Sequence, residues 1–308
     1  MLTLAIPDER RWLVTTVPTM GTYGEIQIDG PAYLMASATR RLDELEASWS
    51  RFRPDSELEL LHARAGSWTA VSADLARILS LALVMNRQTG GWFDPSVRTA
   101  LEQLGYDRPF RALDTEHDTP RYPPPLPAMG LSGLEVDLPA GRARVAPGLR
   151  VDLGGIGKGL AADIVAHEAV MFGARAACVG LGGDVAVAGE PPQTGGWEIP
   201  VTHPTTGEEL DRHLLTAGGM AMSTTLLRAW RQGPKQQHHL IDPSRGCSAE
   251  TGIDAVAVVA RSTVRAEVLA KSALIAGDIW GRRMLRDAGV KAWIVRGTEV
   301  ERIEGDGF

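Results

Sequence analysis

The sequence predicts an α+β fold. Helical and strand-like segments are both present, yet they do not alternate in the strict strand–helix–strand order of a doubly wound parallel sheet. The chain has 308 residues, of which 44% are hydrophobic and 23% are charged. This length and composition are typical of a globular protein that buries a large core.

The first third of the chain predicts a hairpin followed by two amphipathic helices. Alternating apolar residues in Trp12–Pro18 and Gly24–Ile28 indicate two strands. Helical periodicity predicts a helix over Pro31–Trp49 and a second over Ala73–Thr89, with Ser72 as the N-cap of the second. The apolar face expected for the first helix consists of Leu34, Ala38, Leu42, Leu45 and Trp49.

Short apolar segments, each typical of a strand, dominate the rest of the chain. Helices are expected near Lys158–Phe172, Val264–Ala276 and Ile279–Ala288. The expected strands are Leu134–Leu138, Arg142–Val145, Ala176–Leu181, Val185–Ala188, Trp197–Val201, His213–Ala217, Ala255–Ala260 and Lys291–Val295.

One segment interrupts this pattern. His117–Pro127 contains five prolines and cannot form a regular element. We expect residues 1–308 to form a single domain, in which this proline-rich loop near 117–127 separates an N-terminal from a C-terminal lobe.

Charge and hydropathy exclude several classes of protein. The net charge of −6 argues against binding to duplex nucleic acid. No apolar run approaches the roughly 18 residues of a membrane span, and Pro7 comes too early for a signal peptide. Cys178 and Cys247 lack metal-ligand spacing, so they are expected to be free thiols in a reducing compartment. We therefore expect a cytoplasmic protein.

A single lysine framed by four glycines is the most informative local pattern, in Val151–Ala162. Glycines let backbone N–H groups approach a ligand, and the N-terminus of a helix adds partial positive charge. Lys158 adds a full charge. The segment therefore predicts a site for a phosphate or pyrophosphate.

The segment is nevertheless neither a P-loop nor a dinucleotide fingerprint. Asp152 and Gly159 occupy the positions where a P-loop requires a glycine and a hydroxyl residue, and Leu160 replaces the third glycine of the fingerprint. A glycine-rich turn that leads into a helix and carries a solvated lysine explains the local pattern as well.

Six ordered segments together decide the interpretation, although each alone has a structural explanation such as an N-cap or a hairpin turn. The segments are Met-Gly-Thr at 20–22, Ser-Arg-Phe-Arg-Pro-Asp-Ser-Glu at 50–57, Phe-Asp-Pro-Ser-Val at 93–97, Asp-Leu-Gly-Gly-Ile-Gly-Lys-Gly at 152–159, Leu-Gly-Gly-Asp at 181–184 and His-Leu-Ile-Asp-Pro at 239–243. In order and approximate spacing they resemble the ApbE family of FAD:protein FMN transferases over residues 13–297.

The resemblance implies a fold and an activity. The fold is ApbE-like and T-fold-related, with mixed sheets, packed helices and a flavin cleft between two lobes. The activity moves FMN from FAD to a Thr or Ser hydroxyl of a partner flavoprotein, forms a phosphoester and releases AMP. An FAD pyrophosphatase and a non-enzymatic FAD carrier are the alternatives.

The resemblance also assigns residues to the site. His239 would act as the general base, with Asp242 to orient it, and Lys158 would stabilise charge on the phosphates. The residues expected to bind FAD are Met20, Ser56, Glu57, Asp94, Lys158, Gly182, Asp184, Ser223, Thr224 and His239.

The implied magnesium site is altered in this chain. Its ligands would be the backbone carbonyl of Gly157 and the side chain of Glu267, but Lys271 replaces the usual threonine. An ammonium group has only donors and cannot bind a metal ion. Lys271 therefore takes the place of the ion, or transfer is weak, or Glu267 and Lys271 form a solvated surface pair.

Overall fold

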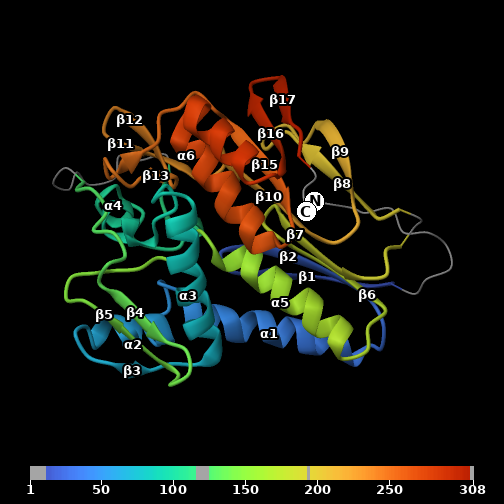
Figure 1. Cartoon of the computed structure of the whole chain (residues 1–308), viewed down its shortest axis with the longest axis horizontal. Coiled ribbons are helices and arrows are strands. Elements are labelled where there is room, and N and C mark those ends of the chain that lie inside the picture. Colours follow the sequence, from blue (N-terminus) through green and yellow to red (C-terminus); the bar gives the residue numbers. More distant parts are fainter. Residues whose placement is uncertain (1–11, 116–124, 193–194, 306–308) are drawn as a thin grey trace.

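The computed structural model describes residues 12–115, 125–192 and 195–305. Its centre is an eight-stranded sheet in which each strand is antiparallel to its neighbours (Figure 1). In spatial order the strands are β1 (Trp12–Thr19), β2 (Thr22–Asp29), β6 (Ala176–Leu181), β7 (Asp184–Gly189), β10 (Gly218–Thr224), β15 (Ala255–Ala260), β16 (Lys291–Arg296) and β17 (Glu299–Ile303).

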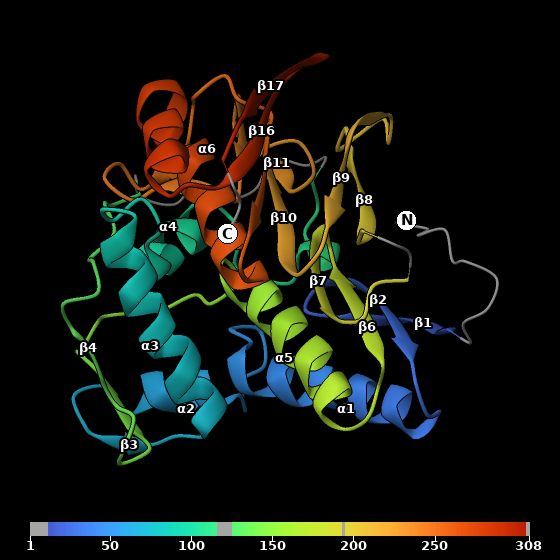
Figure 2. The same ribbon diagram turned by 45° about the vertical axis from the view of Figure 1, so that its right-hand side comes forward.

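Helices cover one face of this sheet. They are α1 (Tyr33–Trp49), α5 (Gly157–Met171) and α6 (Thr263–Asp287), and Figure 2 shows them side by side across the sheet. The buried face of α1 consists of the five residues that the helical periodicity predicts. The two helices expected in the C-terminal part form one helix, α6, which is kinked at Gly277 (φ 76°).

A hairpin covers the opposite face. It consists of β8 (Trp197–Thr202) and β9 (Glu209–Leu215). Successive residues of a strand point to opposite faces. In β15, Val256 and Val258 accordingly pack in the core with α6, whereas Ala257 and Val259 pack in the core with β8 and β9. Burial on both faces explains why all six residues of β15 are apolar.

A second group of elements lies beside the main sheet, on the left in Figure 1. A small sheet is packed with three helices there, and short hairpins and 3-10 helices complete the group. These elements are α2 (Glu57–Ala63), β3 (Thr69–Ala70), α3 (Ala73–Gln88), η1 (Pro95–Val97), α4 (Arg98–Gln103), η2 (Phe110–Ala112), β4 (Leu134–Asp137), β5 (Arg142–Val145), β11 (Ala229–Gln232), β12 (Lys235–His238), β13 (Ile241–Asp242) and β14 (Cys247–Ser248).

The structure confirms the α+β class and corrects several local predictions. The strand expected at His213–Ala217 begins at Glu209, because partly exposed charged residues hide its alternation. The seven-residue helix α2 and the strand β10 were not predicted as regular elements. Among the described residues, none of the helices is long and apolar enough to cross a membrane.

Strands that precede the proline-rich segment pair with strands that follow it. β2, which precedes it, pairs with β6, which follows it. Likewise β3 pairs with β5. The segment itself lies mostly outside the described residues, since 116–124 are not described.

Candidate active site

A cavity of about 490 Å³ opens between the main sheet with its helices and the second group of elements. Its walls come from the β1–β2 turn, the segment that follows α1, the segments around η1 and η2, the loop before α5, and α6. Of the residues predicted for the site, those that line it are Met20, Asp94, Gly157, Lys158 and His239, together with Lys271.

Lys158 is the second residue of α5 and lies on the cavity wall. Its Nζ is 2.6 Å from Asp184 Oδ2 on β7 and 2.6 Å from Glu267 Oε1 on α6. Burial lowers the pKa of the Lys158 ammonium, but the two carboxylates outweigh burial and raise it above its usual value. Lys158 is therefore a charged, partly buried group held by two carboxylates, and its interpretation as a freely solvated lysine is wrong.

Lys271 lies one helical turn beyond Glu267 and contacts the same carboxylate. Its Nζ donates a hydrogen bond to the carbonyl of Gly155 (3.0 Å) and is 3.6 Å from Glu267 Oε1. The predicted pairing of Glu267 with Lys271 is therefore confirmed. Glu267 is only 1% exposed, so the pair is not a solvated surface bridge.

These four residues, Lys158, Lys271, Asp184 and Glu267, form what we call the lysine cluster. Its carboxylates are almost fully buried, with side chains 1% and 2% exposed, while the lysine side chains are 15% and 14% exposed. Burial raises the pKa of Glu267, but Lys158 and Lys271 outweigh burial and hold it below its usual value. The cluster thus places its positive charges at the cavity and its negative charges behind them.

The backbone amides of the glycine segment differ from the prediction. Four of them make hydrogen bonds inside the protein instead of facing the cavity. Gly159 N donates to Glu267 Oε2 (2.8 Å), and the other three are those of Gly154, Ile156 and Gly157. The segment therefore contributes positive charge to the cavity chiefly through Lys158.

His239 follows β12 and lines the cavity. Its Nδ1 atom is buried and has no hydrogen-bond partner among the described residues. Burial lowers the pKa of His239 well below 6.5, and the nearby cations Arg228 and Lys271 lower it further. The imidazole is therefore neutral at neutral pH and can accept a proton.

Asp242, the residue predicted to orient His239, bonds within its own turn. Its Oδ1 accepts hydrogen bonds from Ser244 N (2.9 Å) and Ser244 Oγ (2.7 Å). Within the part of the chain that the structure describes, none of its recorded hydrogen bonds reaches His239. Asp242 therefore stabilises the turn after β13.

Met20 and Asp94 lie at two other walls of the cavity. Asp94 accepts a hydrogen bond from Ser96 N (2.8 Å) and so caps η1, as its Asp-Pro-Ser context predicts. Met20 has φ 48°, in the left-handed region that non-glycine residues avoid. Its N–H donates to Glu46 Oε2 on α1 (2.9 Å), which holds the strained turn over the cavity.

Ser56 and Glu57 are not among the residues that line the cavity. Ser56 caps α2 by accepting a hydrogen bond from Glu59 N (3.1 Å). Glu57 accepts hydrogen bonds from Ser48 Oγ and Ser72 Oγ. These two residues therefore connect α1, α2 and the start of α3.

Gly182, Ser223 and Thr224 also lie outside the cavity lining. Gly182 is the first residue of the β6–β7 turn and has φ 59°. Ser223 is buried in β10, and Thr224 Oγ1 donates to the carbonyl of Asp254. Their predicted contacts with a ligand stay predictions.

Four arginines at the cavity were not assigned to the site by sequence: Arg51, Arg53, Arg111 and Arg228. Arg51 bonds with Asp152 (Nε–Oδ2 3.2 Å) and lies 4.1 Å from the ring centroid of Phe52. The Ser-Arg-Phe run at 50–52 could have indicated a binding site from the sequence alone, but ending the preceding helix explained the same residues equally well.

A second ion cluster, which we call the arginine cluster, lies outside the cavity lining. Its centre is Arg98, which donates to Glu59 Oε2 (3.0 Å) and Glu102 Oε1 (2.9 Å). His62 belongs to it through Glu59 and accepts a hydrogen bond from Val151 N (3.0 Å). Burial raises the pKa of Glu59, but bonds from His62 and Arg98 outweigh burial and lower it to about 2.

The residues present do not fit the magnesium ion that the family resemblance implies. Two ammonium groups already contact Glu267 Oε1, that of Lys158 at 2.6 Å and that of Lys271 at 3.6 Å, and they would repel an ion there. The carbonyl next to this carboxylate, that of Gly155, accepts from Lys271, and Gly155 stands two residues before Gly157. Among the described residues, no group of three His, Cys, Asp or Glu side chains is placed to hold a metal.

In this antiparallel α+β scaffold, the cavity is lined by two partly buried lysines and a neutral histidine, and so presents positive charge to a ligand. The model of the ApbE family matches residues 20–294, and the chain belongs to this family.

Relatives and solved structures agree with this assignment. The chain is 25% identical to the FAD:protein FMN transferase of Haemophilus influenzae over 290 residues, covering 89% of this chain and 83% of the relative. It is 26% identical to that of Salmonella typhimurium over 302 residues, covering 94% and 84%. The ApbE protein of Thermotoga maritima superimposes with a TM-score of 0.84 at 25% identity, covering 96% of this chain and 97% of that one. The flavinyl transferase ApbE of Pseudomonas stutzeri has a similar fold, with a TM-score of 0.81 over 97% and 96% of the two chains at 23% identity.

Proposed function

We propose that this chain is an FAD:protein FMN transferase. The oxygen of a Thr or Ser hydroxyl on a partner protein attacks the phosphorus on the FMN side of the FAD pyrophosphate. A new P–O bond joins FMN to the partner, the P–O bond to the bridging oxygen breaks, and AMP leaves with that oxygen. The hydroxyl proton passes to the enzyme. We further propose that the chain performs this reaction as one catalytic domain.

One observation carries the proposal: two partly buried ammonium groups line the same cavity as a neutral histidine whose Nδ1 has no partner among the described residues. Phosphoryl transfer needs cations where negative charge develops and a base for the attacking hydroxyl. The cavity supplies both groups along its walls. Its size of about 490 Å³ is in the range of sites for cofactors.

Lys158 and His239 divide the work in this scheme. Lys158 binds the pyrophosphate oxygens and stabilises the charge that leaves with AMP. His239 Nδ1 takes the hydroxyl proton, and its lowered pKa keeps it unprotonated before the reaction. Asp184 and Glu267 act from behind, because they fix the position of the Lys158 ammonium.

Four other predicted residues have roles in flavin binding in this proposal. Two of them line the cavity and two hold neighbouring helices in place. Met20 contacts the flavin directly in this proposal, because it lines the cavity. Asp94 lines the wall that η1 forms. Ser56 and Glu57 act indirectly, since their hydrogen bonds position the helices behind that wall.

The acceptor in this proposal is a flavoprotein with an exposed Thr or Ser in the cytoplasm. The two cysteines of the chain, Cys178 and Cys247, are both free, which is typical of a reducing compartment. The negative net charge of the chain favours a protein acceptor over nucleic acid.

The test is incubation of the purified protein with FAD and a flavoprotein acceptor, followed by denaturing gels and measurement of AMP. Covalent flavin fluorescence on the acceptor together with AMP supports transfer. AMP and free FMN without labelled acceptor indicate hydrolysis, as in an FAD pyrophosphatase. Bound FAD without either product indicates a carrier, and both of these outcomes contradict the proposal.

A further inference from the structure

We propose that Lys271 supplies a fixed cation at the pyrophosphate in place of a divalent metal ion, so that flavin transfer by this chain does not require a metal. This inference rests on the proposed transferase function. It concerns a residue that shares the cavity and the carboxylate of Lys158.

The first argument is the set of atoms around the ammonium. Lys271 Nζ lies between a backbone carbonyl at 3.0 Å, that of Gly155, and a carboxylate oxygen at 3.6 Å, that of Glu267. Carbonyl and carboxylate oxygens are the ligands that magnesium prefers. An ammonium there has no lone pair to offer an ion and would repel it. The lysine therefore occupies the oxygen-rich position itself.

The second argument is the direction of the charges. The carboxylates of the lysine cluster are nearly inaccessible, whereas both ammonium-bearing side chains reach the cavity. An isolated cation in a buried position is costly, so it is retained only where partners or a ligand compensate for it. Among the described residues, Lys271 Nζ makes one hydrogen bond and one longer ion pair, although it has three donors. The pyrophosphate is the partner that completes its coordination.

The third argument is the use of lysine rather than arginine. The chain has 32 basic residues, of which only Lys158, Lys235, Lys271 and Lys291 are lysines. Two of these four lie in one cluster on the cavity. An ammonium is a compact point charge, whereas a guanidinium is planar and broad. A compact cation is the group that can stand where a small metal ion would stand.

The fourth argument is the space left for Lys271. A Cβ at Gly155 would lie 3.2 Å from Lys271 Nζ and 3.3 Å from its Cε, tighter than most real contacts. Glycine at 155 therefore lets the lysine lie across the loop and reach the carbonyl.

The experiment compares metal dependence in the wild type and in Lys271→Thr. Removing the ammonium leaves a carboxylate and a carbonyl facing an open position, which a divalent ion can enter. We expect the wild type to label the acceptor equally well with excess EDTA or with Mg²⁺. Lys271→Thr should lose roughly 10²-fold in EDTA, the cost of removing one charge-stabilising group, and Mg²⁺ should restore about tenfold or more.

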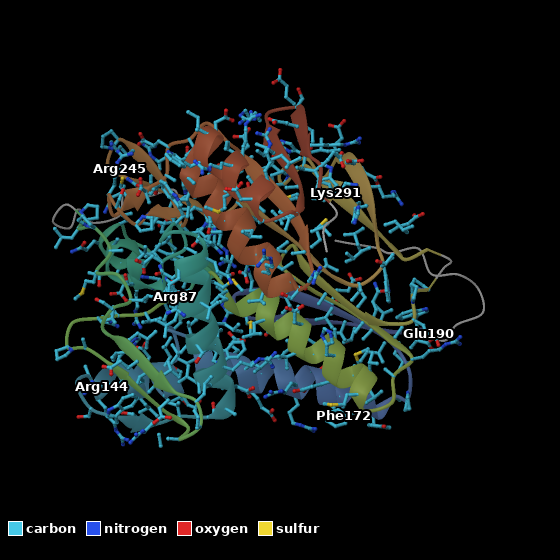
Figure 3. The ribbon with its side chains drawn as sticks, viewed as in Figure 1. Arg87, Arg144, Phe172, Glu190, Arg245 and Lys291 are labelled. Carbon is cyan, nitrogen blue, oxygen red and sulfur yellow. The ribbon has the colours of Figure 1, made fainter. Side chains whose placement is uncertain are left out.

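Two further variants make the comparison specific. In Lys271→Thr combined with Glu267→Asp, the shorter carboxylate leaves more room for an ion, and we expect stronger rescue by Mg²⁺. Lys291→Thr is the matched control, because Lys291 lies on the side of the molecule that carries β8 and β9, away from the cavity lining (Figure 3). It should behave as the wild type in both conditions.

A second readout does not depend on turnover. Electron paramagnetic resonance of Mn²⁺ in the presence of FAD reports whether an ion binds. The wild type should leave Mn²⁺ free, and the double variant should bind one ion. Stoichiometric Mn²⁺ binding by the wild type with FAD would overturn the inference even if no acceptor were ever labelled.

The remaining outcomes are equally decisive. Loss of transfer by the wild type in EDTA, or a Lys271→Thr enzyme that folds but is not rescued by Mg²⁺, contradicts the role of Lys271. If Lys271→Thr does not fold, Lys271→Met keeps the apolar stem, and the EDTA and Mn²⁺ tests on the wild type decide alone. Absence of labelled acceptor and AMP under all conditions refutes the transferase proposal instead.

Discussion

The lysine cluster and the arginine cluster use the same kinds of charge in opposite arrangements. In the lysine cluster the carboxylates of Asp184 and Glu267 are buried and the cations reach the cavity. In the arginine cluster the cation is buried, with the Arg98 side chain 4% exposed, while the side chains of Glu59 and Glu102 are 19% and 28% exposed.

This difference distinguishes a cluster that can bind a ligand from a structural cluster that only stabilises the fold. Buried carboxylates fix cations at a cavity surface, where they can meet an anionic ligand. A buried guanidinium with outer carboxylates presents no such charge, and instead joins α2 to α4. Burial of an ion pair alone is therefore no sign of function, and the direction in which its charges face decides the matter.

The largest expected effect tests whether His239 acts as the base in the reaction for which the lysine cluster supplies the cations. His239→Gln should lower the rate of covalent flavin formation by about 10²–10⁴-fold, the usual contribution of a general base. FAD affinity should change little, because the imidazole is neutral. Single-turnover labelling measures the rate and fluorescence titration the affinity.

His213→Gln is the control for that variant. His213 is also a histidine whose pKa is lowered by burial, but it packs against Trp293, outside the cavity lining. Equal losses in the two variants would show that His239 has no special role.

The next prediction sets the two clusters directly against each other. Lys158→Met should reduce turnover by about 10²–10³-fold. Arg98→Met should leave turnover per folded molecule unchanged and cost about 1.5–3 kcal/mol of stability, because it removes charge-assisted hydrogen bonds to Glu59 and Glu102. Urea unfolding and transfer assays on both proteins measure the two effects. If Arg98→Met lost turnover as Lys158→Met does, the arginine cluster could not be distinguished from the lysine cluster as a purely structural group.

The activity that depends on His239 and the stability that depends on the arginine cluster should respond to different ranges of pH. Because burial, Arg228, Lys271, His238 and Lys158 hold the pKa of His239 below 6.5, the base stays neutral where an ordinary histidine is protonated. At pH 6 the rate should exceed that expected for an unshifted histidine, by up to about fourfold. Stability linked to His239 is present above pH 6.5 and is lost as the pH falls towards the lower folded value.

The arginine cluster should respond at lower pH. The pKa of Glu59 is about 2 in the folded protein and 4.5 as its ordinary value. Its contribution to stability is therefore present above pH 4.5 and is lost as the pH falls through 2. Glu59→Gln should flatten this part of the stability curve, measured by urea unfolding between pH 5 and pH 2.5. An unchanged curve would show that Glu59 does not contribute to stability through the arginine cluster.

The smallest effect concerns strain at the cavity rim. Met20 is the only non-glycine residue with positive φ among the described residues. Met20→Gly should relieve the strained φ and change stability by no more than about 1 kcal/mol, while FAD affinity falls because a cavity contact is lost. Gly21→Ala in the same turn is the opposite control and should destabilise the protein. Improved FAD binding by Met20→Gly would contradict the proposed flavin contact.

Local physics made much of the fold predictable. The five residues of the α1 core face recur with the period of a helix, and Ser72 caps α3 as its side chain predicts. Glu267 and Lys271 meet because residues four apart share a helical face. These features depend on neighbours within a few residues, whose geometry the backbone alone sets.

Other local patterns fitted either a ligand-binding role or a purely structural role, and only the tertiary packing decided between them. Ser56 and Asp242 occupy matching motifs, yet their hydrogen bonds serve a helix cap and a turn. The amides around Lys158 face protein acceptors, because the start of α5 packs against α6 at Gly159, where a Cβ would lie 2.8 Å from a backbone oxygen of Thr263.

The sequence by itself determined the α+β class, the ordered family motifs and the presence of a lysine beside glycines. The tertiary structure decided that Lys158 meets a carboxylate 109 residues further along the chain, that a second lysine shares this carboxylate, and which arginines reach the cavity. The physical reason is the distance along the chain over which each kind of interaction acts. Periodicity and capping arise between near neighbours, whereas the partner and direction of a buried charge depend on how the sheet brings distant helices together.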